Sequence, residues 1–191
     1  MRRILKTILW LAASSLIASH AFADAPAYTL IKEKSFVKFI AIQNGAPVEG
    51  KFKDFTADIH FDHDNLDQSS ITVEVATASV VVADDEIAKN LKMPEWLASE
   101  AFPKAVFTCK KLTRMPASEN YYADGTLTLH GKTVPVVLNF QMEHFDGTNA
   151  IATGFITLHR QDFDIGQGEW SRDDVIKNEV RVEFRIAAVK K

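Results

Sequence analysis

The chain has 191 residues, with 22 Lys and Arg, 25 Asp and Glu, and a single Cys. This excess of acid argues against nucleic acid as a partner, because phosphate binding requires a positive face. One Cys cannot form an intramolecular disulfide, so the fold must be held together by a hydrophobic core.

The first 23 residues have the layout of a secretory signal peptide. Three basic residues fall within the first six positions, an apolar run covers Ile8–Ile17, and Ala21-Phe22-Ala23 is a small-x-small cleavage site. The apolar run is too short to span a bilayer. Cleavage after Ala23 would remove three basic residues and no acidic one, leaving 168 residues with a net charge of −6. We therefore expect a secreted, periplasmic protein with one domain at residues 24–191.

Most of the remaining chain alternates apolar and polar side chains with the period of a β-strand. The clearest segment is 179–186, where Val180, Val182, Phe184 and Ile186 share one face and Glu and Arg occupy the other. A row of opposite charges suits solvent and cross-strand pairing. The same alternation predicts further strands at residues 28–32, 35–42, 55–62, 71–76, 105–112, 121–129, 133–142 and 150–160.

Residues 84–103 break this pattern. Ile87, Leu91 and Leu97 follow helical rather than strand spacing. Asp84 favours a helix start, and Pro94 suits a first helical position. We expect one or two short helices inserted between strands.

The predicted fold class is all-β, a closed antiparallel barrel of about eight strands, since closure removes exposed strand edges. The interior of such a barrel is filled by side chains or holds one small ligand. Phe55, Ile59 and Phe61, for example, share one face of their predicted strand. They could form a packed core or the wall of a cavity, and periodicity does not separate these alternatives.

The best candidates for metal ligands are His60 and His63. Residues three apart on a strand point to opposite faces, so these two would converge only if the strand ended between them. His60 does share a face with Asp58 and Asp62. A solvated strand edge is the simpler interpretation, and no metal site is predicted.

Cys109 is the only candidate nucleophile with unusual neighbours. Two adjacent lysines could lower its thiol pKa, but it shares strand parity with Phe107, which favours a buried, inert thiol. No nucleophile-elbow, zinc-protease or phosphate-cradling motif occurs in the sequence. We expect no catalytic residues and no enzyme activity. The alternative, a hydrolase or metal enzyme in the barrel mouth, would depend on His60, His144 or Cys109.

The segment His159–Asp174 combines Arg160, Trp170 and Arg172 with two glycines between two predicted strands. It could cover a cavity and place an arginine near a polar head group. The alternative is an ordinary tight connection whose Trp170 packs on the end of the barrel.

The sequence resembles the YceI-like family of exported polyisoprenoid-binding proteins over essentially all of residues 24–191. The resemblance rests on five segments in the family order: a Gly-x-Phe-x-x-Phe strand ending in Phe-Asp (Val48–Asp62), a helical turn running into Phe-Pro and a Phe-bearing strand (Met93–Phe107), a Gly-x-Leu-Thr-x-x-Gly-x-Thr hairpin (Asp124–Leu138), an Arg-x-Asp-Phe-x-Ile-Gly segment (Arg160–Trp170) and the closing strand (Asn178–Lys190). One departure is that residues 167–170 lengthen the loop after Gly166, as in members linked to b-type cytochrome membrane proteins.

The resemblance implies a lipocalin-like barrel that binds a long-chain polyisoprenoid or similar amphiphilic lipid rather than catalysing a reaction. No cofactor is implied besides such a lipid. The longer loop leaves the head group open and admits a prenyl-quinone-like ligand. The alternative function is an accessory protein that presents such a ligand to a membrane cytochrome in electron transfer; a homodimer is also left open. Carried over by position, the ligand-binding candidates are Val37, Phe39, Phe52, Ile59, Phe107, Leu127 and Phe140 inside, and Arg160, Trp170 and Arg172 at the mouth.

Overall fold

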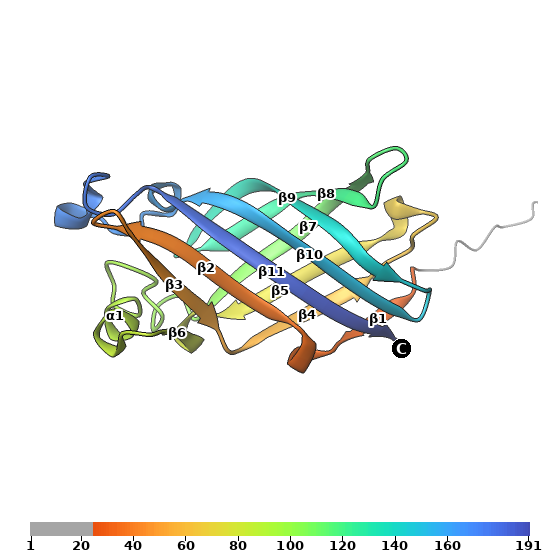
Figure 1. Ribbon diagram of the computed structural model, residues 1–191, viewed down its shortest axis with the longest axis horizontal. Coiled ribbons are helices and arrows are strands. Elements are labelled where there is room, and N and C mark those ends of the chain that lie inside the picture. Colours follow the sequence, from red (N-terminus) through yellow and green to blue (C-terminus); the bar gives the residue numbers. More distant parts are fainter. Residues whose placement is uncertain (1–24) are drawn as a thin grey trace, which may run out of the picture.

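The computed structural model describes residues 25–191, so the expected signal peptide lies outside the described residues. Eleven strands and one α-helix form the described fold (Figure 1). Their bounds are β1 (Ala27–Leu30), β2 (Phe36–Gln43), β3 (Ala46–Phe52), β4 (Phe55–His60), β5 (Ser70–Ala76), β6 (Val80–Val82), α1 (Asp85–Asn90), β7 (Lys104–Arg114), β8 (Asn120–Leu129), β9 (Lys132–Phe145), β10 (Asn149–His159) and β11 (Glu179–Lys190). Short 3-10 helices are η1 (Lys32–Lys34), η2 (Leu66–Gln68), η3 (Thr77–Ser79), η4 (Arg160–Phe163) and η5 (Gly168–Ser171).

Eight of the strands close into an antiparallel barrel, in the order β1-β4-β5-β7-β8-β9-β10-β11. The closing contact joins β1 to the end of β11, with Tyr28 opposite Lys190 and Leu30 opposite Ala188. This confirms the predicted fold class of an all-β barrel of about eight strands. In all eight of these strands the alternation of side chains places apolar residues on the inner face.

One end of the barrel is built differently, because β11 pairs with β1 along one part of its length and with β2 along another. The chain bends between β1 and β2 at η1, where the Ser35 hydroxyl donates to the Ile31 carbonyl (2.8 Å) and accepts from the Ala187 N–H (2.9 Å). Beyond β2, the sheet continues through β3 to the short β6. The Phe-rich stretch at residues 44–62 is thus two strands, β3 and β4, with different partners.

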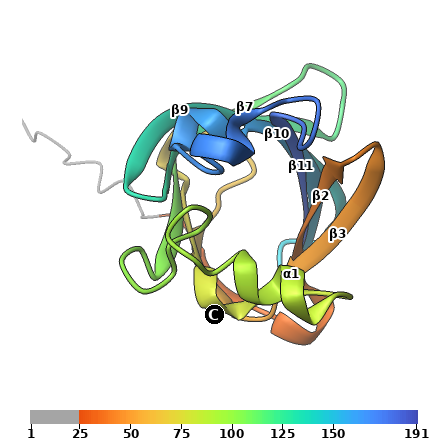
Figure 2. The same cartoon turned by 90° about the vertical axis from the view of Figure 1, so that its left-hand side faces the viewer.

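The inserted helical segment lies at this same end, at the rim of the ring of strands (Figure 2). The Asp84 carboxylate caps α1 by accepting from the N–H groups of Glu86 and Ile87. The residues after α1, Pro94 among them, form turns, so the segment holds one of the one or two short helices expected there. Backbone bonds between these turns, such as Leu97 N–H to Leu91 O (3.0 Å), replace helical ones. Within residues 25–191, no helix is both long and apolar enough to cross a membrane.

The turn between β9 and β10 depends on Asp146. Its carboxylate accepts hydrogen bonds from the Asn149 and Thr148 backbone N–H groups and from the Asn149 amide. These bonds, together with the ring of His144, hold the pKa of Asp146 well below its usual range.

We expect Asp146→Ala to destabilise the fold at pH 7. Because the pKa of Asp146 is lower in the folded state, its stabilisation is present above about pH 4 and is lost as the pH falls further. Urea unfolding of wild type and variant should therefore give free energies that differ at pH 7 and converge at low pH. The control is Asp67→Ala, an exposed carboxylate. A difference between wild type and Asp146→Ala that persists unchanged at pH 2 would contradict this account.

Candidate ligand-binding site

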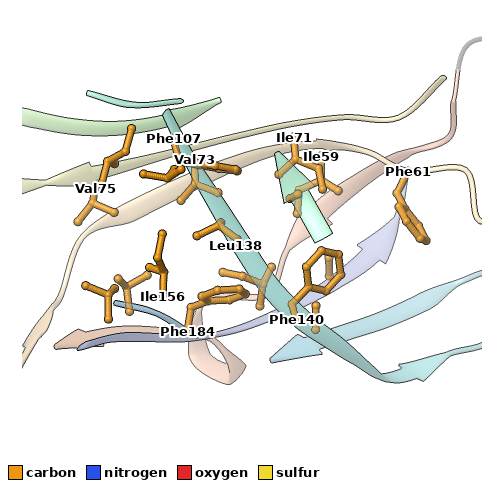
Figure 3. A pocket seen from close by; sticks show the side chains of 18 of the residues that line it. Ile59, Phe61, Ile71, Val73, Val75, Phe107, Leu138, Phe140, Ile156 and Phe184 are labelled. Atoms are coloured by element: carbon orange, nitrogen blue, oxygen red, sulfur yellow. The ribbon is translucent and has the colours of Figure 1, made fainter. Parts of the chain in front are cut away.

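A cavity runs inside the barrel between facing strand walls (Figure 3). Its volume is about 190 Å³, whereas a single water molecule needs roughly 10–15 Å³. Lining positions on β10 extend from Ala150 to Leu158, which is about 27 Å along the strand. In Figure 3, Ile71 and Val73 face Ile156 and Phe184 from opposite walls.

The lining is hydrocarbon almost throughout. Its only heteroatoms in side chains are the Tyr28 hydroxyl and the Met142 sulfur. The Tyr28 hydroxyl is occupied, since it donates to the Gly147 carbonyl (3.1 Å). A cavity of this chemistry can hold an apolar chain without water and offers no partner for a charge.

The cavity exists because several inward positions carry very small side chains. Ala150 and Ala152 line it from β10, and Ala105, Ala123 and Ala188 line it from other strands. These five alanines were not among the candidates from the sequence. The only signal for them is that they fall on the apolar face of their strands, where a packed core would require bulkier residues.

Aromatic side chains close the end of the barrel near the β9–β10 turn. The Phe61 ring packs edge-on against Phe145 (5.5 Å between centroids) and Tyr121 (6.2 Å). Tyr121 is fully buried and stacks on Phe140 (5.1 Å). Burial raises the pKa of Tyr121, against an opposing effect of Arg114, so the phenol stays neutral.

The other end, which we call the mouth, is closed by a second cluster of buried side chains: Phe39, Val80, Leu97, Phe163 and Ile165. Outside it lies a hollow of about 100 Å³ between α1, β2 and the loop before β11. Trp96 and Trp170 line this hollow with their ring centroids 5.9 Å apart. Gln43 and Asn90 provide its polar side chains, and no charged residue lines it.

Arg160 holds the mouth loop in place. Its Nη1 donates to the carbonyls of Ile165 (2.8 Å) and Gly166 (2.9 Å), and its Nη2 to those of Trp170 (2.7 Å) and Ile176 (2.9 Å). Its Nε donates to Lys177 O (3.3 Å). All five N–H donors of the guanidinium are thus engaged by backbone.

The surroundings of Arg160 are built for this role. Its side chain is only 4 % exposed, and burial lowers the pKa of the guanidinium while the Asp173 carboxylate opposes that shift. Gly166 adopts φ +70°, and a Cβ there would lie 2.4 Å from Arg160 Nη1. The loop therefore needs glycine at this position for both conformation and space.

The ligand-binding residues predicted from the sequence lie partly in the cavity and partly at the mouth. Five of the seven inward candidates line the cavity: Val37, Ile59, Phe107, Leu127 and Phe140. Phe39 and Phe52 instead pack in the mouth cluster. Trp170 lines the mouth hollow, and Arg172 is exposed and paired with Asp174. Arg160 faces backbone carbonyls rather than an open site, so it positions the loop and has no donor left for a head group.

The remaining reactive side chains do not converge. Within residues 25–191, no group of three or more His, Cys, Asp or Glu is arranged to hold a metal ion. His63 lies past the end of β4, stacked on Phe145 (5.1 Å). Burial raises the pKa of Cys109, against an opposing backbone hydrogen bond at Lys111. The thiol is therefore protonated at neutral pH and a poor nucleophile.

Replacing Arg160 should loosen the mouth loop. Arg160→Met would leave five carbonyls without their donor, and we expect the free energy of unfolding to fall by about 3 kcal/mol. Arg160→Lys should also lose stability, because an ammonium has three donors. Arg172→Ala, on the surface of the same loop, should change it by less than about 0.5 kcal/mol. Urea unfolding measures the loss of stability, and hydrogen exchange of residues 161–178 measures the loosening of the loop. Equal effects of Arg160→Met and Arg172→Ala would contradict the role assigned to Arg160.

Comparison with known proteins agrees with this geometry. The crystal structure of BcnA from Burkholderia cenocepacia superimposes with a TM-score of 0.79 at 26 % identity, covering 84 % of this chain and 99 % of BcnA. A domain from Saccharophagus degradans described as polyisoprenoid-binding has a TM-score of 0.68 at 17 % identity, covering 87 % of this chain and 99 % of that domain. The second likeness shows a shared fold.

Sequence comparison defines the family. A UPF0312 protein of Photorhabdus laumondii is 31 % identical over 140 residues, 72 % of each chain. Another UPF0312 protein, from Pseudomonas syringae pv. tomato, is 32 % identical over 178 residues, which is 87 % of this chain and 91 % of that protein. The YceI-like domain profile matches residues 28–188. This chain belongs to the YceI-like family.

Proposed function

We propose that this protein binds and carries a long-chain polyisoprenoid or similar amphiphilic lipid, with the tail inside the barrel. The observation that supports this most strongly is the continuous hydrocarbon lining of the cavity. Transfer of apolar surface from water into such a lining is worth about 25 cal/mol per Å². The polyisoprenoid-binding description of the neighbour from Saccharophagus degradans is consistent with this ligand class. Carriage outside the cytoplasm, following the predicted signal peptide, is part of the proposal.

The ends of the barrel favour an uncharged head group. The cavity offers no partner for a charge, so the head group must lie at an end. The arginines near the ends are all engaged: Arg160 by carbonyls, Arg114 by Glu119, and Arg172 by Asp174. At the mouth, two tryptophans and two amide side chains suit a neutral, flat or hydroxyl-bearing group.

The alternative function, presentation of a prenyl-quinone-like lipid to a membrane cytochrome, requires the same neutral head group. Binding of a prenyl quinone is its necessary first condition. The uncharged lining of the mouth hollow is the feature of the described residues that favours it.

Filling the cavity should abolish lipid binding. Ala152 lines the cavity, whereas its neighbour Thr153 lies on the outer face of β10. We expect Ala152→Phe to lower the amount of long-chain lipid that copurifies with the protein at least tenfold, and Thr153→Phe to leave it unchanged. Solvent extraction with mass spectrometry measures the lipid, and circular dichroism checks the fold. Wild-type protein that neither contains nor takes up a prenyl lipid would overturn the proposal.

The charge of the head group should affect the affinity for the lipid. Among prenyl lipids of equal chain length, we expect the alcohol and the quinone to bind at least tenfold more tightly than the monophosphate. Competition against a bound fluorescent isoprenoid alcohol measures the three affinities. Tighter binding of the phosphate would show that a cationic subsite exists and would contradict the neutral-head assignment.

A further inference from the structure

The barrel wall is interrupted between β9 and β10. Their ladder runs from Ala150 opposite Phe145 to Phe155 opposite Asn139 and then stops. Both strands continue beyond this point with their other neighbours, β9 with β8 as far as Lys132 and β10 with β11 as far as His159. The facing edges of Val134–Val137 and Ile156–His159, which we call the seam, therefore lack the ladder that joins the rest of these strands.

Pro135 lies in this unpaired part of β9, opposite Thr126 of β8. A proline has no N–H to donate to a ladder, and within sheets it is confined to edge strands, strand starts and bulges. The position of Pro135 therefore agrees with the end of the β9–β10 ladder and shows that the sequence itself favours it. A strand paired on both sides throughout would not tolerate a proline as readily.

Only one layer of side chains separates the cavity from solvent at the seam. A hollow of about 250 Å³ lies over the seam and is lined by residues of both strands and by Asp162 and Phe163 of η4. Val136, Ile156 and Leu158 line this outer hollow and also the inner cavity. All three are half-buried, as are most of the residues that line the cavity.

The other routes into the cavity are more firmly closed. The mouth is blocked by the buried cluster of Phe39, Leu97 and Phe163 and by the loop that Arg160 ties with five hydrogen bonds. The opposite end is blocked by the aromatic packing around Tyr121. At the seam, by contrast, displacing three aliphatic side chains breaks no wall hydrogen bond. The exposed Val137 (45 %) lines the outer hollow, and Phe155 (41 %) ends the ladder beside it with the Arg181 guanidinium 3.6 Å from its ring centroid.

We propose that the seam is a lateral portal through which the apolar tail of the ligand enters and leaves the barrel. This inference rests on the proposed lipid-binding function and specifies its route. Rotation of Val136, Ile156 and Leu158 joins the outer hollow to the cavity. The exposed apolar rim lowers the cost of a tail that is partly inserted.

Bridging the seam tests the portal directly. Val137 and Thr157 would face each other if the ladder continued, and both are exposed. The test protein carries Val137→Cys and Thr157→Cys, with Cys109→Ala to remove the native thiol. The two new thiols are oxidised to a disulfide or, if none forms, cross-linked with a short bis-maleimide. The matched control joins Gln141→Cys and Thr153→Cys, a pair within the intact ladder of the same strands. The probe is all-trans-retinol, a fluorescent, uncharged isoprenoid alcohol, with octaprenol as the long-chain competitor.

We expect the bridged seam to slow retinol uptake and release at least tenfold, with the control pair exchanging at the wild-type rate. A second test uses no cross-link. Ile156→Ala should speed both uptake and release, whereas Ile40→Ala removes the same side chain from the outer face of β2, away from the cavity, and should leave both rates unchanged. Unaltered kinetics in the bridged protein, with retinol still bound at equilibrium, would overturn the portal. Failure of wild type to bind retinol and octaprenol would instead overturn the lipid-binding function.

Discussion

Closure of the strand wall is the constraint on which the rest of the structure depends. The pairing of β1 with the end of β11 completes a ring of backbone hydrogen bonds, and ladder spacing of about 4.8 Å then fixes its circumference. Such a wall cannot contract around small side chains as a helical bundle can. Inward alanines such as Ala150 and Ala152 therefore leave open space. The cavity is a product of wall geometry combined with side-chain volume.

The same wall separates the apolar contacts that a ligand finds inside the barrel from the polar contacts at its ends. The long apolar interior excludes charge, so polar contacts for a ligand are confined to the ends. At the mouth, Arg160 donates its hydrogen bonds to backbone carbonyls of the loop, including those of Gly166 and Trp170, and has none left for a ligand. This leaves indole rings and amides as the surface that a head group would meet. Selectivity there follows from shape and the absence of charge.

The sequence predicted the strands, the barrel and the apolar inner face because each depends on a local period of two. It predicted neither β3 (Ala46–Phe52) as a separate strand nor the three-residue β6. Pairing over long distances, which gives β3 and β4 different partners, leaves no local pattern. The role of Arg160 was also beyond it. In a sequence, an arginine that binds backbone carbonyls cannot be told from one that faces a ligand. Only the fold shows which groups surround the guanidinium. Hydrophobic alternation likewise gave the positions facing inward but not whether their volumes fill the space.

A closed wall that fixes the cavity also hinders its loading, since a long chain must pass without unfolding the barrel. At the mouth, passage would break charge-assisted hydrogen bonds worth roughly 1.5–3 kcal/mol each and expose the buried Phe163. At the seam, the ladder is already absent and Pro135 cannot restore it. Side-chain rotation there costs far less than strand separation. The interruption thus leaves the hydrogen bonds that set the width of the barrel intact and gives the tail a route at right angles to its axis.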